Sequence, residues 1–163
     1  MLPGFLSVAD AQTLFNRLLH HVPWQQVTWN GRPFKRLVYR ASPDDPIYQS
    51  LNNIIHSLEA NGINTPKGIF LNLYRDENDL TPYHKDTYGV DIFTLSLGAT
   101  RTLRFKPDNR DLRSFDYRIN SGDLYGFTQA INATHQHMIP KPTKKQLEEP
   151  AWQGARISIV FFC

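Results

Sequence analysis

Short runs of alternating apolar and polar residues fill the chain after Pro66, and they constrain the fold more than any other feature of the sequence. Such runs, bounded by turn-forming residues, are typical of β-strands. Short strands that follow a pair of helices indicate an α+β domain, in which a sandwich or jelly roll carries helices on one of its sheets. We expect strands near residues 68–75, 92–97, 102–105, 116–119, 123–127, 133–138 and 156–162.

Two helices are expected before these strands. Ser7 and Asp10 form a capping box at the start of the first helix, and Pro23 closes it. The second helix begins at Asp45-Pro46, where a side-chain cap precedes proline in the first turn, and it ends at Asn61-Gly62. Both segments carry apolar residues at helical spacing, namely Leu14, Leu18 and Leu19 in the first and Ile47, Leu51, Ile54, Ile55 and Leu58 in the second.

The length and composition limit the class of protein. A chain of 163 residues has room for one domain, so residues 1–163 are expected to form a single unit. No apolar run approaches the roughly 20 residues that span a bilayer, and the N-terminus shows no secretory signal. The lone cysteine, Cys163, excludes a disulfide framework and favours a reducing compartment. We therefore expect an intracellular protein, either cytoplasmic or nuclear. We also expect a monomer. The net charge of +3 is compatible with an anionic partner without requiring one.

Candidate metal ligands lie in two places. His84 and Asp86 stand two residues apart in an extended segment, a spacing that lets both bind one ion, although a surface His–Asp hydrogen bond explains it equally well. His135 and His137 lie on a strand-like run, and either one, or neither, is a ligand. Two histidines and one carboxylate on one side of a metal form the facial triad of non-haem Fe(II) oxygenases, which leaves positions open for a cosubstrate and dioxygen.

Three further polar residues interrupt apolar strands. Asn72 and Tyr74 point to the same side of their strand and require hydrogen-bond partners if buried. Arg156 is the first residue of the last strand. It binds a carboxylate if it faces a cavity, and it prevents the strand edge from pairing with another chain if it faces solvent.

In these motifs the sequence resembles the AlkB-like Fe(II)/2-oxoglutarate-dependent dioxygenases along nearly its whole length. Asn72-Leu73-Tyr74 and His84-Lys85-Asp86 are similar to the N-x-Y and H-x-D block of that family, at the same interval. His137-Met138-Ile139-Pro140 resembles its distal H-x-x-P motif, which favours His137 over His135. The other matching blocks are Leu2-Pro3-Gly4-Phe5-Leu6, Leu95-Ser96-Leu97-Gly98-Ala99-Thr100-Arg101, Gly122-Asp123-Leu124 and Arg156-Ile157-Ser158-Ile159.

The resemblance implies a double-stranded β-helix (jelly-roll) core and a set of roles. His84, Asp86 and His137 would hold Fe(II), while Asn72, Tyr74 and Arg156 would hold 2-oxoglutarate as cosubstrate. Reaction with O2 would yield succinate and CO2 and would place oxygen in a substrate C–H bond. Hydroxylation of an N-alkyl carbon would then release an aldehyde and restore a nucleic-acid base.

The chain departs from the family pattern at two places. Phe162 stands where the closing strand of the family carries a second arginine, so Arg101 and Arg104 are candidates for the missing cation. After the H-x-D motif, Thr87-Tyr88 replaces the acidic residues of the repair enzymes, and Tyr88 could stack on a base.

The substrate lid of the family corresponds to about residues 28–45. Here Lys35, Arg36, Tyr39 and Arg40 suit phosphate contacts and base stacking, although a solvated hairpin fits the same residues. We therefore expect oxidative dealkylation of alkylated DNA or RNA. The alternatives are a 2-oxoglutarate-dependent hydroxylase or demethylase of a protein or small molecule and, third, a binding module without catalysis.

Overall fold

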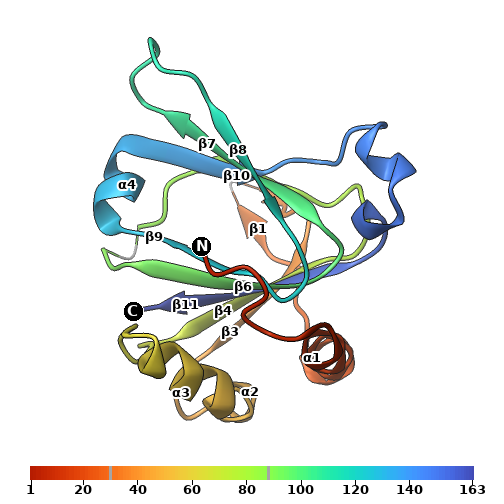
Figure 1. Ribbon diagram of the computed structural model, residues 1–163, viewed down its shortest axis with the longest axis vertical. Coiled ribbons are helices and arrows are strands. Elements are labelled where there is room, and N and C mark those ends of the chain that lie inside the picture. Colours follow the sequence, from red (N-terminus) through yellow and green to blue (C-terminus); the bar gives the residue numbers. More distant parts are fainter. Residues whose placement is uncertain (30, 88) are drawn as a thin grey trace.

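Two antiparallel sheets face each other in the computed structural model, which describes residues 1–29, 31–87 and 89–163 (Figure 1). The larger sheet has the strand order β3-β4-β11-β6-β9. Its strands are β3 (Leu37–Ala41), β4 (Ile69–Tyr74), β11 (Arg156–Phe162), β6 (Ile92–Gly98) and β9 (Leu124–Phe127). The last strand of the chain, β11, therefore lies in the middle of this sheet.

The smaller sheet has the order β5-β10-β7-β8, and a separate hairpin joins β1 to β2. Its strands are β5 (Thr81–His84), β10 (His135–Ile139), β7 (Arg101–Pro107) and β8 (Phe115–Ile119), and the hairpin consists of β1 (Thr28–Trp29) and β2 (Arg32–Pro33). This arrangement confirms the predicted α+β class with a double-stranded β-helix core.

Strand alternation divides the larger sheet into two unlike faces. One face is apolar and packs against the helices, as at Leu71, Leu95 and Ile159. The other face looks toward the smaller sheet and carries most of the buried polar side chains of β4, β6 and β11, namely Asn72, Thr94, Ser96, Arg156 and Ser158. Buried polar groups need partners, so the space between the sheets is where a functional site is expected.

Three helices, α1 (Val8–His21), α2 (Pro46–Gln49) and α3 (Asn52–Ala60), cover the outer face of the larger sheet (Figure 1). The helix α1 starts at the predicted cap, where the Asp10 amide donates to Ser7 Oγ at 3.1 Å. The predicted continuous second helix is wrong, because the chain forms α2 and then α3. The break follows from the tight turn between them, in which the Leu51 amide donates to the Tyr48 carbonyl while the Tyr48 hydroxyl donates to the Pro66 carbonyl.

The strand predicted at residues 133–138 starts two residues later, because α4 (Gln129–Thr134) precedes β10. Thr128 caps this helix by accepting a hydrogen bond from the Ile131 amide. Two short 3-10 helices, η1 (Gln146–Glu148) and η2 (Pro150–Trp152), complete the loop before β11.

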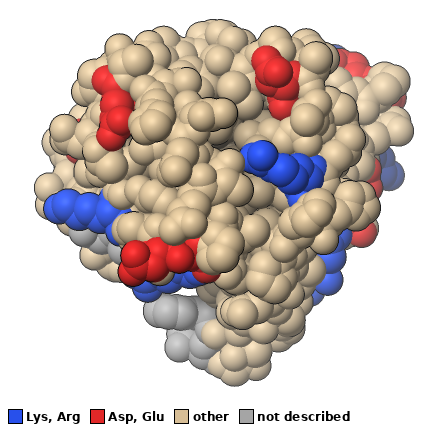
Figure 2. Space-filling model, turned by 90° about the horizontal axis from the view of Figure 1, so that it is seen from below, with Lys and Arg blue, Asp and Glu red and all other residues tan. Residues whose placement is uncertain are grey.

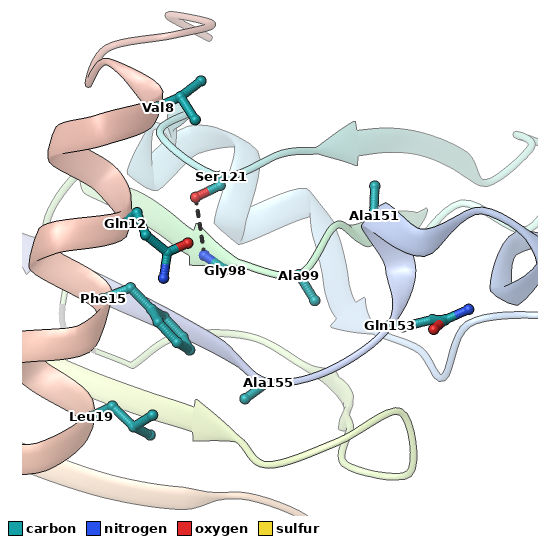
Figure 3. Close-up of a pocket in the computed structure, with 10 residues that line it drawn as sticks. All are labelled: Val8, Gln12, Phe15, Leu19, Gly98, Ala99, Ser121, Ala151, Gln153 and Ala155. Carbon is teal, nitrogen blue, oxygen red and sulfur yellow. Dashed lines mark hydrogen bonds between the residues drawn. The ribbon is translucent and has the colours of Figure 1, made fainter.

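The contact between α1 and the larger sheet depends on a glycine (Figure 3). Gly98 has φ +82°, and a Cβ atom there would lie 2.7 Å from the Phe15 ring and 2.5 Å from the Ala155 carbonyl oxygen. A shallow cavity of about 390 Å3 lies beside this contact, lined by α1 and by the loop that contains Ala151 and Gln153.

Among the described residues, the helix-covered face shows no large patch of one charge (Figure 2). Lys and Arg side chains are scattered among Asp and Glu side chains on it. In the part of the chain that the structure describes, no helix is both long and apolar enough to span a bilayer.

Candidate metal centre and cosubstrate cavity

The register of the smaller sheet brings the candidate ligands together. His84 ends β5 and pairs directly with His137 on β10, and Asp86 follows two residues after His84. His84 Nε2 lies 3.7 Å from Asp86 Oδ1, and His137 Nε2 lies 3.5 Å from Asp86 Oδ2. Two ligands each about 2.1 Å from one ion are at most about 4.2 Å apart, so both histidine–aspartate distances suit a shared metal. Potential ligand atoms of the three residues lie within 4.8 Å of one another.

The orientation of His84 also suits a ligand. Its Nδ1 lies 2.9 Å from the Pro82 carbonyl oxygen, a contact in which Nδ1 carries the proton. The lone pair of Nε2 is then available to a metal, as in many sites where a carbonyl fixes the ligand tautomer.

Burial shifts the pKa values of two members of the triad, His137 and Asp86. It lowers the pKa of His137 to about 3, with a further contribution from the charge of His84, so His137 is a neutral imidazole able to bind a cation. Burial likewise raises the pKa of Asp86, while the charges of His84 and Arg36 oppose that rise. A metal ion would supply the positive charge that a buried carboxylate needs.

His135 is not part of this ligand group, although it lies two residues from His137. Its Nδ1 contacts Thr134 Oγ1 at 2.9 Å, and its ring packs edge-on against Phe105 and Phe115. The structure thus brings His137 and not His135 to Asp86.

Asn132 positions Asp86, a role that was not predicted from the sequence. Its Oδ1 accepts a hydrogen bond from the Asp86 amide at 3.0 Å, and its Nδ2 donates to the Asp86 carbonyl at 2.6 Å. Asn132 lies on α4, and the sequence pattern predicts only a strand near this segment. No feature of the sequence therefore indicates that Asn132 contacts the H-x-D motif.

A cavity of about 600 Å3 opens beside the triad, between the two sheets. Asn72 and Tyr74 line it. Asn72 Nδ2 donates to Ser158 Oγ at 3.1 Å, and the Tyr74 hydroxyl lies 2.7 Å from Thr81 Oγ1. Both side chains are therefore held in fixed orientations at the cavity wall.

Arg156 lies beneath this wall and is fully buried. Its Nε donates to Ser96 Oγ at 2.9 Å, its Nη2 donates to the Tyr125 hydroxyl at 3.3 Å, and its guanidinium lies 5.1 Å from the centre of the Tyr74 ring. Its Nη1 is buried without a hydrogen-bond partner among the described residues. An orphaned guanidinium nitrogen next to a cavity fits a carboxylate ligand.

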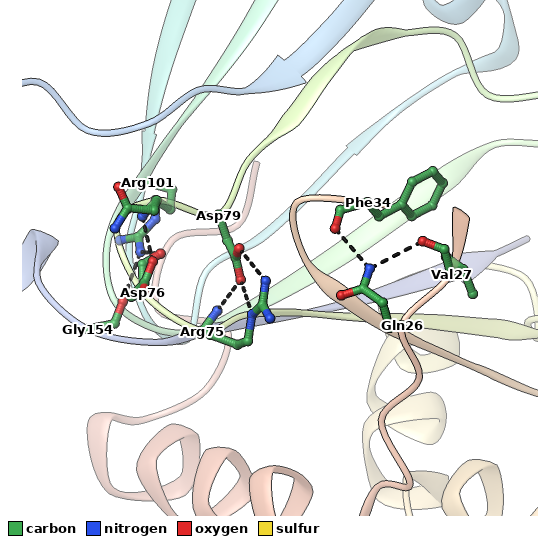
Figure 4. Close-up of polar contacts among 9 residues, drawn as sticks. Gln26, Val27, Phe34, Arg75, Asp76, Asp79, Arg101 and Gly154 are labelled. Carbon is green, nitrogen blue, oxygen red and sulfur yellow. Dashed lines mark hydrogen bonds and ion pairs between the residues drawn. The ribbon is translucent and has the colours of Figure 1, made fainter. Parts of the chain in front are cut away.

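Neither Arg101 nor Arg104 replaces the missing second arginine, so that expectation is wrong. The Arg101 guanidinium donates to four backbone carbonyls, those of Asp76, Thr100, Trp152 and Gly154 (Figure 4). Burial and the charge of Arg156 lower its pKa to about 10. Arg104 forms a two-pronged ion pair with Asp116 at 2.7 Å. Neither side chain lines the cavity, because both serve loop and strand contacts elsewhere.

The predicted lid residues are placed differently from one another. Lys35 and Arg40 are exposed, whereas Arg36 is buried and lines the cavity. Tyr39 packs against the helix-side core and donates to Asp45 Oδ2 at 2.6 Å, so it points away from the cavity. Tyr88 lies outside the described residues.

The lid segment is attached to the body of the protein. Gln26 Nε2 donates to the Val27 and Phe34 carbonyls (Figure 4). The Leu80 amide donates to the Lys35 carbonyl at 2.9 Å. Its second half, β3, is an edge strand of the larger sheet.

Aromatic side chains lead outward from His137 along β7 and β8. The Phe127 ring lies 4.8 Å and the Phe105 ring 5.9 Å from the His137 ring, and Phe115 stacks on Phe105 at 5.4 Å. Phe115 and Tyr117 are 40% and 45% exposed. We call Phe105, Phe115, Tyr117 and Phe127 the aromatic cluster; from the sequence, their segments are predicted only as strands.

Comparisons with known proteins agree with this site. The family model described as "2OG-Fe(II) oxygenase superfamily" matches residues 29–161, and the chain belongs to that superfamily. It is 29% identical to human alpha-ketoglutarate-dependent dioxygenase alkB homolog 3 and 28% identical to the Bos taurus protein of that name, each over 85% of this chain. The chain spans 59% of the length of each relative.

A solved structure titled "The structure of OsALKBH1" shares the fold. It superposes with a TM-score of 0.71 at 14% identity, over 99% of this chain and 96% of that one. The resemblance to AlkB-like dioxygenases is thereby confirmed, and the superfamily implies Fe(II), 2-oxoglutarate and O2 as metal, cosubstrate and oxidant.

Proposed function

We propose that the chain is a dioxygenase that uses Fe(II) and 2-oxoglutarate to dealkylate nucleic-acid bases oxidatively. Two neighbouring features carry the proposal. The first is the His84–Asp86–His137 group at the cavity, and the second is Arg156 Nη1, which is buried behind the cavity wall without a hydrogen-bond partner among the described residues. A divalent metal fits the first feature and a carboxylate fits the second.

His84, Asp86 and His137 would hold the metal, and Asn72, Tyr74 and Arg156 would hold the cosubstrate. When bound, the metal and cosubstrate supply the oxidising chemistry. The protein's own part is to fix their orientation. Asn132 holds the backbone of Asp86, and the hydrogen bond to the Pro82 carbonyl sets the His84 ring.

Two surfaces support a nucleic-acid substrate. Lys35 and Arg40 are exposed cations on the segment beside the cavity, where they suit phosphate groups. The aromatic cluster extends from the metal ligand His137 to solvent and suits the stacking of unpaired bases. These features favour single-stranded DNA or RNA as the substrate. We also propose that the chain acts as a monomer inside the cell.

The experiment supplies the purified chain with Fe(II), 2-oxoglutarate and N-methylated single-stranded DNA or RNA, and measures formaldehyde and succinate. We expect both products together, with little formaldehyde from the unmethylated oligonucleotide. The Asp86→Ala variant is the matched control and should produce neither. Absence of formaldehyde from every methylated oligonucleotide, in protein that binds metal and 2-oxoglutarate, would exclude this substrate class.

A specific observation keeps a second candidate, a hydroxylase or demethylase of a protein or small molecule. Arg36 is buried and Tyr39 is turned away, which leaves the predicted lid with one fewer exposed charge and one fewer ring for base stacking than its sequence indicates. Succinate formation that rises with peptides or small metabolites, and not with methylated oligonucleotides, would favour this candidate.

A further inference from the structure

Arg36 is a buried cation in the cosubstrate cavity. Only 8% of its surface is exposed, and it lies in the bend that precedes β3. Its Nε donates to Asn72 Oδ1 at 2.6 Å, and its guanidinium packs on the Phe34 ring at 4.5 Å. These contacts hold the side chain against the cavity wall.

The charge of Arg36 has no direct carboxylate partner. Among the described residues no ion pair within 4.0 Å includes Arg36, whereas Arg75, Arg104 and Arg118 each form one. Among the described residues its one hydrogen bond uses Nε, which leaves both terminal nitrogens to a ligand. A buried charge without a counter-ion is costly unless an anion arrives to pair with it.

The position of Arg36 relative to the triad indicates which anion that is. Arg36 lines the same cavity as the triad, and it shares Asn72 with Ser158 of the closing strand. Arg156 lies behind the cavity residues Tyr74 and Tyr125 and is the second buried cation on this side of the cavity. Two guanidinium groups, one from the bend before β3 and one from β11, match a ligand with two carboxylates.

We propose that Arg36 binds the 2-oxoglutarate carboxylate nearer the metal and so replaces the arginine that is absent at Phe162. This inference rests on the proposed function and assigns Arg36 to the cosubstrate instead of the nucleic acid. The backbone phosphates of a polymer require accessible cations, which Lys35 and Arg40 provide and the buried Arg36 does not.

The test is calorimetric titration of 2-oxoglutarate into Mn(II)-loaded protein, which requires no turnover. Arg36→Gln should raise the Kd by about 10- to 100-fold, because a charge-assisted contact to a buried carboxylate is lost. Lys67→Gln is the control; it removes an exposed charge that does not line the cavity and should leave the Kd unchanged. Arg36→Lys should fall between wild type and Arg36→Gln.

Folding is checked by thermal unfolding and by the Mn(II) affinity of each variant. A folded, Mn(II)-loaded Arg36→Gln protein whose Kd for 2-oxoglutarate stays within about twofold of wild type would overturn the inference. If wild type itself fails to bind 2-oxoglutarate, the proposed function is wrong. If wild type binds it and Arg36→Gln binds it equally well, only the role of Arg36 is wrong.

A crystal structure of wild type with Mn(II) and N-oxalylglycine, a 2-oxoglutarate analogue, provides a second test that does not depend on a variant folding. Arg36 within hydrogen-bond distance of the carboxylate nearer the metal supports the inference. A bound analogue with no contact to Arg36 overturns it.

Discussion

At the scale of single residues, the metal site depends on Asn132 as well as on its ligands. The side chain of Asn132 holds the amide and the carbonyl of Asp86, so its removal frees the loop that carries the carboxylate. Asn132→Ala should weaken Mn(II) binding by about 10- to 100-fold, the usual effect of losing a group that orients a ligand. Electron paramagnetic resonance of free Mn(II) measures this. The exposed Asn53→Ala on α3 is the control, and equal affinities in both variants would contradict the role of Asn132.

Asp79 provides a pH-dependent contribution to stability. Burial alone would raise the pKa of Asp79. This effect is outweighed by hydrogen bonds from the Arg75 side chain and amide (Figure 4) and by the charges of Arg75 and Lys35, so the pKa is lowered. A lowered pKa in the folded state stabilises the protein above the unfolded pKa of about 3.9, and this contribution disappears as the pH falls through the folded value.

Asp79→Asn should therefore lower the free energy of unfolding by about 1–2 kcal/mol at pH 7. Urea denaturation at pH 7 and at decreasing pH measures it, and the gap from wild type should close in acid as the wild-type carboxyl is protonated. Asp44→Asn, at an exposed residue without an ion pair among the described residues, should show no such gap. A gap of constant size down to the acid transition would show that the charge of Asp79 is not its source.

The metal ligands are easier to predict from the sequence than the lid. His84, Asp86 and His137 are defined by spacing on extended strands, and strand register does bring them together. The local pattern at Arg36 and Tyr39 indicates surface residues, and both are placed otherwise. Burial of Arg36 depends on the bend before β3 and on Asn72, which is 36 residues further along the chain, so no local pattern reveals it.

At the scale of elements, the contact of α1 with β6 depends on Gly98. Gly98→Ala should destabilise the protein by about 2–4 kcal/mol, because the left-handed φ of +82° is strained for alanine and the new Cβ would overlap Phe15 and the Ala155 carbonyl. Gly62→Ala is a matched control with φ +77° and no atom within 4 Å of the new Cβ. It should cost only about 1 kcal/mol. Thermal and urea unfolding measure both, and equal losses would contradict the close packing at Gly98.

The elements that the sequence pattern did not predict have physical explanations. The strand β5 contains Pro82, and proline in a short run argues against a strand unless the strand lies at a sheet edge, which is where β5 lies. The basic residues Lys35, Arg36 and Arg40 suggest a solvent-exposed lid, and so conceal a strand. Within that segment Leu37 to Ala41 form an edge strand that pairs with β4.

At the scale of the whole molecule, the net charge of +3 carries little information about the partner. Several cations are matched by acids on the surface, as in the pairs Arg75–Asp79, Lys85–Asp108, Arg104–Asp116 and Arg118–Glu149. The helix-covered face is mixed in charge (Figure 2). The cations that matter for function are the few near the cavity, where Arg36 and Arg156 are buried and Lys35 and Arg40 are exposed.

We propose that one cavity binds a metal and 2-oxoglutarate together. Calorimetric titration of 2-oxoglutarate, with and without Mn(II), is the sharpest test of this proposal. Wild type should bind 2-oxoglutarate at least about tenfold more tightly with Mn(II) than without it, the size of coupling expected of ligands that share a site. Asp86→Ala should lose this difference. Equal 2-oxoglutarate affinity of wild type with and without the metal would contradict the account.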